Sequence, residues 1–193
     1  MYGRENLLFS HVESAYPPFG LLYPDQLYFP GRDPTLTPET LPMAFGRWAT
    51  AFYSPIVEPT DDVDILAARK QMHEVSSEDR FIPTVDRLSL EELASLADIG
   101  VLGRSALCMR NTELQVWAHN ADKALFNCDP ESAFSHVDTI VLWCDMGVTS
   151  STFTAGYLAQ RFMEGSEEGK RTRKATIARI DEANHMVIVA ITF

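Results

Sequence analysis

The last third of the chain has the hydrophobic pattern of alternating strands and helices. Residues 138–144 form a near-continuous apolar run, which is typical of a strand buried on both faces of a parallel sheet. An amphipathic helix is predicted over about 150–163, and a second strand over 175–180, with 187–193 as a further candidate. The inward positions of the helix are Phe153, Tyr157 and Phe162. Strand, helix and strand at this spacing predict a βαβ unit and therefore an α/β protein.

Helical patterns dominate the first two thirds of the chain. Residues 16–38 contain a proline or glycine every few positions and predict an irregular segment. Four helices are predicted after it: from Thr37 to Pro55, after Thr60 and before the loop 81–84, from Ser89 to Gly100, and from about Asn111 to Phe126. The third has the clearest start, because Ser89 and Glu92 form a capping box. Two parallel strands do not make a sheet alone, so further strands are missing or come from another chain.

Composition narrows the class of protein. The 193 residues are 46% apolar and 22% charged, which is typical of one compact globular domain, or one plus an appendage. The net charge of −11 disfavours nucleic acid and anionic membranes as partners, because both repel an acidic protein. The three cysteines, Cys108, Cys128 and Cys144, cannot all pair, so buried thiols in a reducing compartment are predicted.

Targeting and cofactor signals are not found in the sequence. The apolar run nearest the start, Leu7 to Phe9, is too short for a signal peptide, and no run is long enough to span a membrane. The chain has no His-x-x-x-His pair and no glycine-rich phosphate loop, so neither a metal nor a nucleotide cofactor is predicted. We therefore expect a cytoplasmic protein without a membrane span.

Two polar loops follow the predicted strands. Residues 144–147 come directly after the first strand, and residues 181–186 follow the second. In open parallel sheets, catalytic groups gather at the carboxyl ends of the strands, where neighbouring ends lie close together. Asp145 and His185 are therefore the candidate pair. An acid that orients a histidine, which in turn activates a nucleophile, is the general arrangement of acyl-transfer sites.

This C-terminal pattern resembles that of the α/β-hydrolase fold family. In that family an apolar strand ends in Trp-Gly-Asp, and the next strand precedes a small-residue turn ending in Gly-His or Asn-His. The matching segments here are 138–145 and 178–186. The helices over about 35–135 are similar to the cap that these enzymes insert over the active site. The resemblance implies a partial α/β-hydrolase-like fold, with a helical cap-like region and irregular N-terminal segment over 1–135 and a C-terminal βαβ unit over 136–193.

Carried over position by position, the resemblance makes His185 the catalytic base. Asp145 matches the aspartate of Trp-Gly-Asp, with Cys144 in place of the glycine. The family's catalytic acid usually lies two residues further on, at a position that Gly147 occupies here. Three possibilities stay open: Asp145 takes the role of the acid, an earlier strand supplies it, or it is absent.

The nucleophile of the family has no counterpart in this sequence. It lies in a Gly-x-Ser-x-Gly pentapeptide at a tight strand-to-helix turn. The nearest match, Gly103 to Leu107 around Ser105, has leucine as its last residue and follows a predicted helix, so a loop or capping serine is the better interpretation. The His-Gly oxyanion loop is missing as well. We therefore expect part of a longer hydrolase of ester, amide or related C–X bonds, weakly active or inactive alone.

If the missing parts of the hydrolase are supplied, we expect such a site to take a small apolar or ester-type substrate. Two other interpretations stay open. A non-catalytic binding or interaction module would dock a partner, including a second copy in a homo-oligomer, through the exposed sheet edge and residues 187–193. The third is an unrelated small α/β protein in which the match at Asn184 and His185 is accidental, and it would gain support if Asp145 and His185 lay at opposite ends of the sheet.

Overall fold

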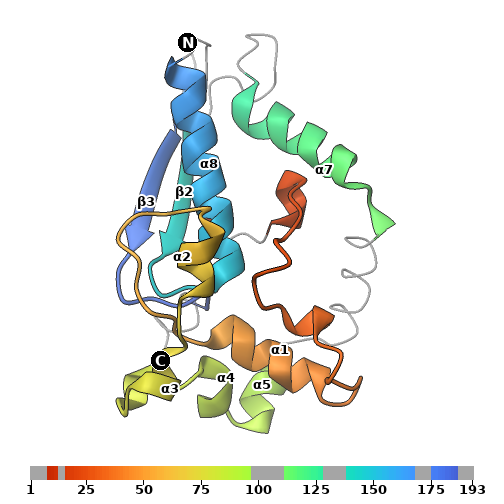
Figure 1. Cartoon of the computed structure of the whole chain (residues 1–193), viewed down its shortest axis with the longest axis vertical. Helices are drawn as coiled ribbons and strands as arrows, with labels where there is room; N and C mark the ends of the chain where they lie inside the picture. Colours follow the sequence, from red (N-terminus) through yellow and green to blue (C-terminus); the bar gives the residue numbers. More distant parts are fainter. Residues whose placement is uncertain (1–7, 13–15, 97–110, 128–137, 168–174, 187–193) are drawn as a thin grey trace, which may run out of the picture.

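The computed structural model describes residues 8–12, 16–96, 111–127, 138–167 and 175–186. These residues form helices and a small parallel sheet (Figure 1), which places the chain in the α/β class. Several predicted features lie outside them: Gly103 to Leu107 with Ser105, Cys108, Cys128, and the strand candidate 187–193.

Within the described residues, the sheet has three parallel strands in the order β1-β2-β3. β1 spans Leu8–Val12, β2 spans Asp138–Cys144 and β3 spans Ala175–Ile180. The prediction of β2 and β3 is confirmed. The hydrophobic pattern does not predict β1, because Ser10 and His11 interrupt its short apolar run. The sheet therefore takes one strand from the range 1–135 as well as two from 136–193.

The two faces of β2 differ in burial. Thr139, Val141 and Trp143 are buried, whereas Ile140 and Leu142 are partly exposed. The prediction that both faces are buried is therefore wrong for the described part of the chain. The physical reason is that the helix following β2 covers only the face of Val141, while the apolar residues of the other face keep some contact with solvent (Figure 1).

Helix α8, Thr149–Glu167, connects β2 to β3 and confirms the predicted βαβ unit. Its Leu158 and Phe162 are buried against Val141, and Tyr157 packs at the margin of the same cluster. Gly156 lets the backbone of Thr60 lie directly against the helix, because a Cβ atom at position 156 would overlap that backbone. The helix therefore joins the sheet on one side to the segment before α2 on the other.

The remaining helices, described residues 16–96 and 111–127, form what we call the helical region. Its α-helices are α1 (Leu41–Thr50), α2 (Val63–Ala67), α3 (Met72–Val75), α4 (Thr84–Arg87), α5 (Leu90–Leu96) and α7 (Leu114–Ala121). Short 3₁₀ turns cover Pro17–Phe19, Pro30–Arg32 and Asp79–Phe81, and a π-helical turn covers Asp122–Phe126. A long connection between two adjacent parallel strands thus carries most of the helices.

Two predicted helix caps can be compared with the observed starts of the helices. The capping box is confirmed, since the backbone N–H of Ser89 donates to Glu92 Oε2 (2.7 Å) and that of Glu92 donates to Ser89 Oγ (3.2 Å). The predicted start at Thr37 is wrong. Thr37 forms a separate turn, in which its backbone N–H donates to Thr40 Oγ1 (2.9 Å), and α1 begins only at Leu41.

The predicted second helix is shorter than its hydrophobic pattern indicates. Asp62 caps α2 by accepting bonds from two backbone N–H groups, and the helix ends at Ala67. Leu66 is buried, whereas Ile65 is exposed. Met72 belongs to α3, a separate helix.

Candidate functional site

The turn after β2 is held by one arginine of the helical region. Arg69 follows α2, and its guanidinium donates to the carbonyl oxygens of Asp145 (2.8 Å), Gly147 (2.9 Å) and Ser54 (2.8 Å) and to Thr152 Oγ1 (3.0 Å). A guanidinium presents its donors in a rigid planar fork, so these bonds fix the orientation of the turn. The helical region therefore sets where the residues following β2 lie.

Backbone hydrogen bonds reinforce this contact. Tyr53 N donates to Met146 O (2.9 Å), and Ile56 N donates to Asp145 O (3.2 Å). The carbonyl of Asp145 thus accepts from both the backbone and Arg69. Because Arg69 and the backbone both donate to the carbonyls of the turn, these groups are hydrogen-bonded although the turn is buried.

Asp145 also joins the turn to the loop that carries His185. Asp145 is only 7% exposed, and its Oδ1 accepts a hydrogen bond from Ala183 N (3.3 Å). Its backbone N–H donates to Ile180 O (3.2 Å), and Met146 N donates to Ala183 O (3.1 Å). The carboxyl ends of β2 and β3 are therefore tied to each other by the first candidate residue.

His185 lies against the first turn of α8. Its Nδ1 is 3.2 Å from Ser151 Oγ, and Ser151 is only 2% exposed. A buried hydroxyl at this distance fixes the rotation of the imidazole ring by holding its Nδ1 atom. Among the described residues, the Asp145 carboxylate has its hydrogen bond to Ala183 and none to His185.

Asn184 anchors the histidine loop to the helical region. It is fully buried, and its Nδ2 donates to Thr50 O (2.6 Å) at the end of α1 and to Thr84 Oγ1 (3.1 Å) at the start of α4. Its Oδ1 accepts from Met186 N (3.0 Å). Three bonds around one buried amide fix the backbone on both sides of His185.

The first turn of α8 buries four hydroxyl side chains in succession, Thr149, Ser150, Ser151 and Thr152. Thr149 Oγ1 lies 2.6 Å from the hydroxyl of Tyr23, which comes from the irregular N-terminal segment. Burial raises the pKa of Tyr23 to about 12, so its hydroxyl stays protonated at neutral pH.

A cavity of about 280 Å³ opens beside this turn, between the helical region and α8. It is lined by Gln26, Leu27, Tyr28, Trp48, Tyr53, Leu66, Ala67, Arg69, Lys70, Gln71, Glu74 and Thr149. Its lining reaches α8 at Thr149, two residues before Ser151. The cavity therefore adjoins the turn that contacts His185, while Asp145 and His185 are not among the lining residues.

The predicted residues thus lie at one edge of the sheet. Asp145 and His185 follow neighbouring strand ends, so the opposite-end arrangement that would favour an accidental match is not found. Ser151, Arg69 and the buried role of Asn184 are not predicted by the sequence patterns. The run of hydroxyl residues at 149–152 is the one signal for them, because four small polar residues opening a helix predict buried hydrogen bonds.

Two other expectations concern metals and membranes. Within the described segments, no group of three or more histidine, cysteine, aspartate or glutamate side chains is placed to hold a metal ion. Across the same residues, no helix has both the length and the apolar character needed to cross a membrane. Cys144 is buried, as the sequence predicts for its thiol.

Comparisons with protein families, with curated proteins and with solved structures found no match to this chain. The geometry of the carboxyl edge of the sheet therefore carries the functional argument.

Proposed function

We propose that this chain is an α/β-hydrolase-like unit in which His185 is the general base for hydrolysis of an ester, amide or related C–X bond. The observation that carries the proposal is the junction at the carboxyl edge of the sheet, where the Asp145 carboxylate is bonded to the loop that presents His185. The insertion of the helical region between adjacent parallel strands β1 and β2 supports it, because a cap has this relation to the sheet beneath it.

The contacts of His185 suit a general base. The buried serine beside it does not suit the role of an attacking nucleophile. Ser151 orients the ring through Nδ1 and is itself too buried to contact substrate, so it is a positioning residue. A base acting through the other ring nitrogen would take a proton from the attacking group and return it to the leaving group. The sequence offers no Gly-x-Ser-x-Gly elbow for that attacking group, so catalysis by the chain alone is expected to be slow.

The substrate proposed is a small apolar or ester-type molecule. The nearest support is the cavity beside Thr149, which adjoins the turn that contacts His185 and is lined by apolar residues together with the charged Arg69, Lys70 and Glu74.

Hydrolysis of 4-nitrophenyl butyrate tests the proposed base. We expect slow turnover, at most about 100-fold above that of free imidazole, that disappears in His185→Ala. The matched control is His73→Ala, which removes an exposed histidine of α3 and should leave the rate unchanged. An equal loss in both variants would assign the reaction to surface histidines and contradict the proposal.

The second candidate is a non-catalytic interaction module, and the partly exposed Ile140 and Leu142 favour it. Parallel sheets are normally covered on both faces, so a second copy packed on this face is the occupant that we test. Sedimentation would then show a dimer that Leu142→Glu converts to monomer, while Met163→Glu on the exposed side of α8 would not. A monomeric wild-type chain would contradict this function.

A further inference from the structure

The cavity beside Thr149 combines a buried apolar part with charged groups at the surface. Its volume is about 280 Å³. The buried lining residues are mostly apolar or aromatic, namely Leu27, Trp48, Tyr53 and Leu66. Lys70 and Glu74 line the same cavity and are exposed. A cavity of this kind suits a molecule whose apolar part is enclosed and whose charged groups stay close to water.

Backbone hydrogen bonds hold the segment that carries both of these charges. The backbone carbonyl of Lys70 accepts from Ser54 N (2.8 Å), and Tyr53 forms an antiparallel bridge with Gln71. Helix α3 begins at the next residue and carries Glu74. The backbone on either side of the start of α3 is therefore fixed against the buried part of the cavity, because Tyr53 belongs to both.

The two opposite charges are not paired with each other. Within the described residues, neither the Lys70 ammonium group nor the Glu74 carboxylate forms an ion pair or a side-chain hydrogen bond. The third charged group of the lining, the guanidinium of Arg69, is instead held by four acceptors of the chain. Burial chiefly raises the pKa of Tyr53, and the Glu74 carboxylate adds to the rise, so the charge of Glu74 acts on the buried part of the cavity. A ligand with one negative and one positive group would find a partner for each without breaking an existing bond.

We propose that this cavity binds a free α-amino acid with an aromatic or large aliphatic side chain. The ligand side chain lies against the buried apolar residues, its carboxylate against Lys70 and its ammonium group against Glu74. An apolar cavity of about 150 Å³ accommodates benzene, so one of about 280 Å³ has room for a ring together with the α-amino acid group. Such binding goes beyond the proposed hydrolysis and does not depend on it, because His185 is not among the lining residues.

Three ligands with the same ring separate the two charges. L-Phenylalanine carries both groups, 3-phenylpropanoate lacks the ammonium group, and 2-phenylethylamine lacks the carboxylate. The full chain is labelled with ¹⁵N and titrated with each, while the indole signal of Trp48, which lines the cavity, is followed by NMR. Trp117 and Trp143 do not line it, so their indole signals serve as internal controls.

The complete amino acid should bind most tightly. We expect a Kd of about 1 mM for phenylalanine, as for a ligand of this size, and affinities about threefold weaker for each analogue. The difference is small because ion pairs between exposed groups contribute little.

Three variants test the partners and the space. In Lys70→Gln, phenylalanine should bind no more tightly than 2-phenylethylamine, and in Glu74→Gln no more tightly than 3-phenylpropanoate. Ala67→Phe should weaken all three ligands by filling the cavity while keeping both charges. Lys123→Gln and Glu91→Gln change exposed residues outside the lining, so these matched controls should keep the order of the wild-type chain.

Three outcomes would overturn the proposal. They are an analogue that binds the wild-type chain as tightly as phenylalanine, a Trp48 signal without saturable movement at about 10 mM ligand, and a loss in Lys70→Gln no larger than in Lys123→Gln. The titrations involve no reaction, so their failure is distinguishable from a failure of hydrolysis at His185.

Discussion

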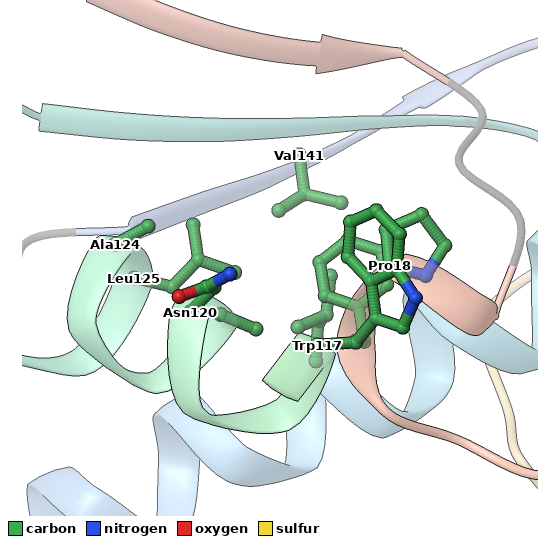
Figure 2. Close-up of a pocket in the computed structure, with 9 residues that line it drawn as sticks. Pro18, Trp117, Asn120, Ala124, Leu125 and Val141 are labelled. Atoms are coloured by element: carbon green, nitrogen blue, oxygen red, sulfur yellow. The ribbon is translucent and has the colours of Figure 1, made fainter. Parts of the chain in front are cut away.

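Two of the contacts between the helical region and the sheet are built in opposite ways. At the carboxyl end of β2, the contact is polar and fully bonded, with Arg69 and the backbone of residues 53–56 satisfying the turn. At Val141 the contact is apolar and borders a cavity of about 190 Å³ (Figure 2). Directional bonds fix the position of a turn, whereas apolar packing permits a space. The first contact is therefore fixed by directional bonds, and the second leaves space beside it.

Removing the guanidinium of Arg69 should break the polar contact. Arg69→Met keeps an apolar stem but leaves the carbonyls of Asp145 and Gly147 without this donor. We expect the free energy of unfolding, measured by urea denaturation, to fall by about 4 kcal/mol. Arg47→Met is the control, because its bond to Asp86 is a surface ion pair, and it should cost under about 1 kcal/mol. Equal losses would show that burial of the turn does not depend on Arg69.

The apolar contact should respond to loss of volume. Leu158→Ala removes a buried side chain that lines the cavity, and we expect a loss of about 3 kcal/mol in the free energy of unfolding. Met163→Ala, on the same helix but 61% exposed, should change it by less than about 0.5 kcal/mol. Thermal and urea denaturation of the two variants provide the measurement. A loss at Leu158 no larger than that at Met163 would mean that this face of α8 is not packed as described.

The burial of the Tyr23 hydroxyl should appear in the pH dependence of stability. In the folded chain the pKa of Tyr23 is raised to about 12 by burial, whereas the unfolded chain has a tyrosine pKa near 10. The unfolded state therefore loses its proton first, so the stabilisation is complete below pH 10 and is lost as the pH rises to 12. We expect that loss to reach about 2 kcal/mol and to be smaller in Tyr23→Phe. Identical pH profiles would contradict this contribution.

The smallest expected effect lies in the loop that carries His185. Glu182 adopts a φ of 54°, which L-residues other than asparagine and aspartate rarely adopt. Glu182→Gly should raise the free energy of unfolding by about 0.5 kcal/mol, because relief of the backbone exceeds the loss of an exposed ion pair with Arg80. Glu182→Gln loses the same ion pair and keeps the φ angle, so its melting temperature should not rise. A rise in both variants would attribute the effect to charge.

Local patterns predicted the parts of the fold that depend on neighbouring residues. The apolar run of β2, the amphipathic face of α8 and the capping box at Ser89 each lie within one element, and each is found in the structure. The edge shared by Asp145 and His185 also follows from sequence, because parallel neighbouring strands point their carboxyl ends the same way.

Contacts between distant residues could not be predicted in this way. Arg69 reaches Gly147 across 78 positions, and nothing in either local pattern indicates the pair. The contact of Ser151 with His185 depends on where the first turn of α8 lies relative to a loop 34 residues away. β1 could not be predicted for a related reason, because a five-residue strand is defined by the strand beside it rather than by its own composition.

The pairing of β1 with β2 has a consequence for synthesis of the chain. Leu8 lies opposite Asp138, so β1 cannot pair with β2 until the ribosome has added 130 further residues. At about 5–20 residues per second, the edge of β1 that pairs with β2 stays open for roughly 10 seconds. β2, α8 and β3 are made within a much shorter interval and can assemble first. We therefore expect newly made chains to depend on chaperones mainly during the production of the helical region.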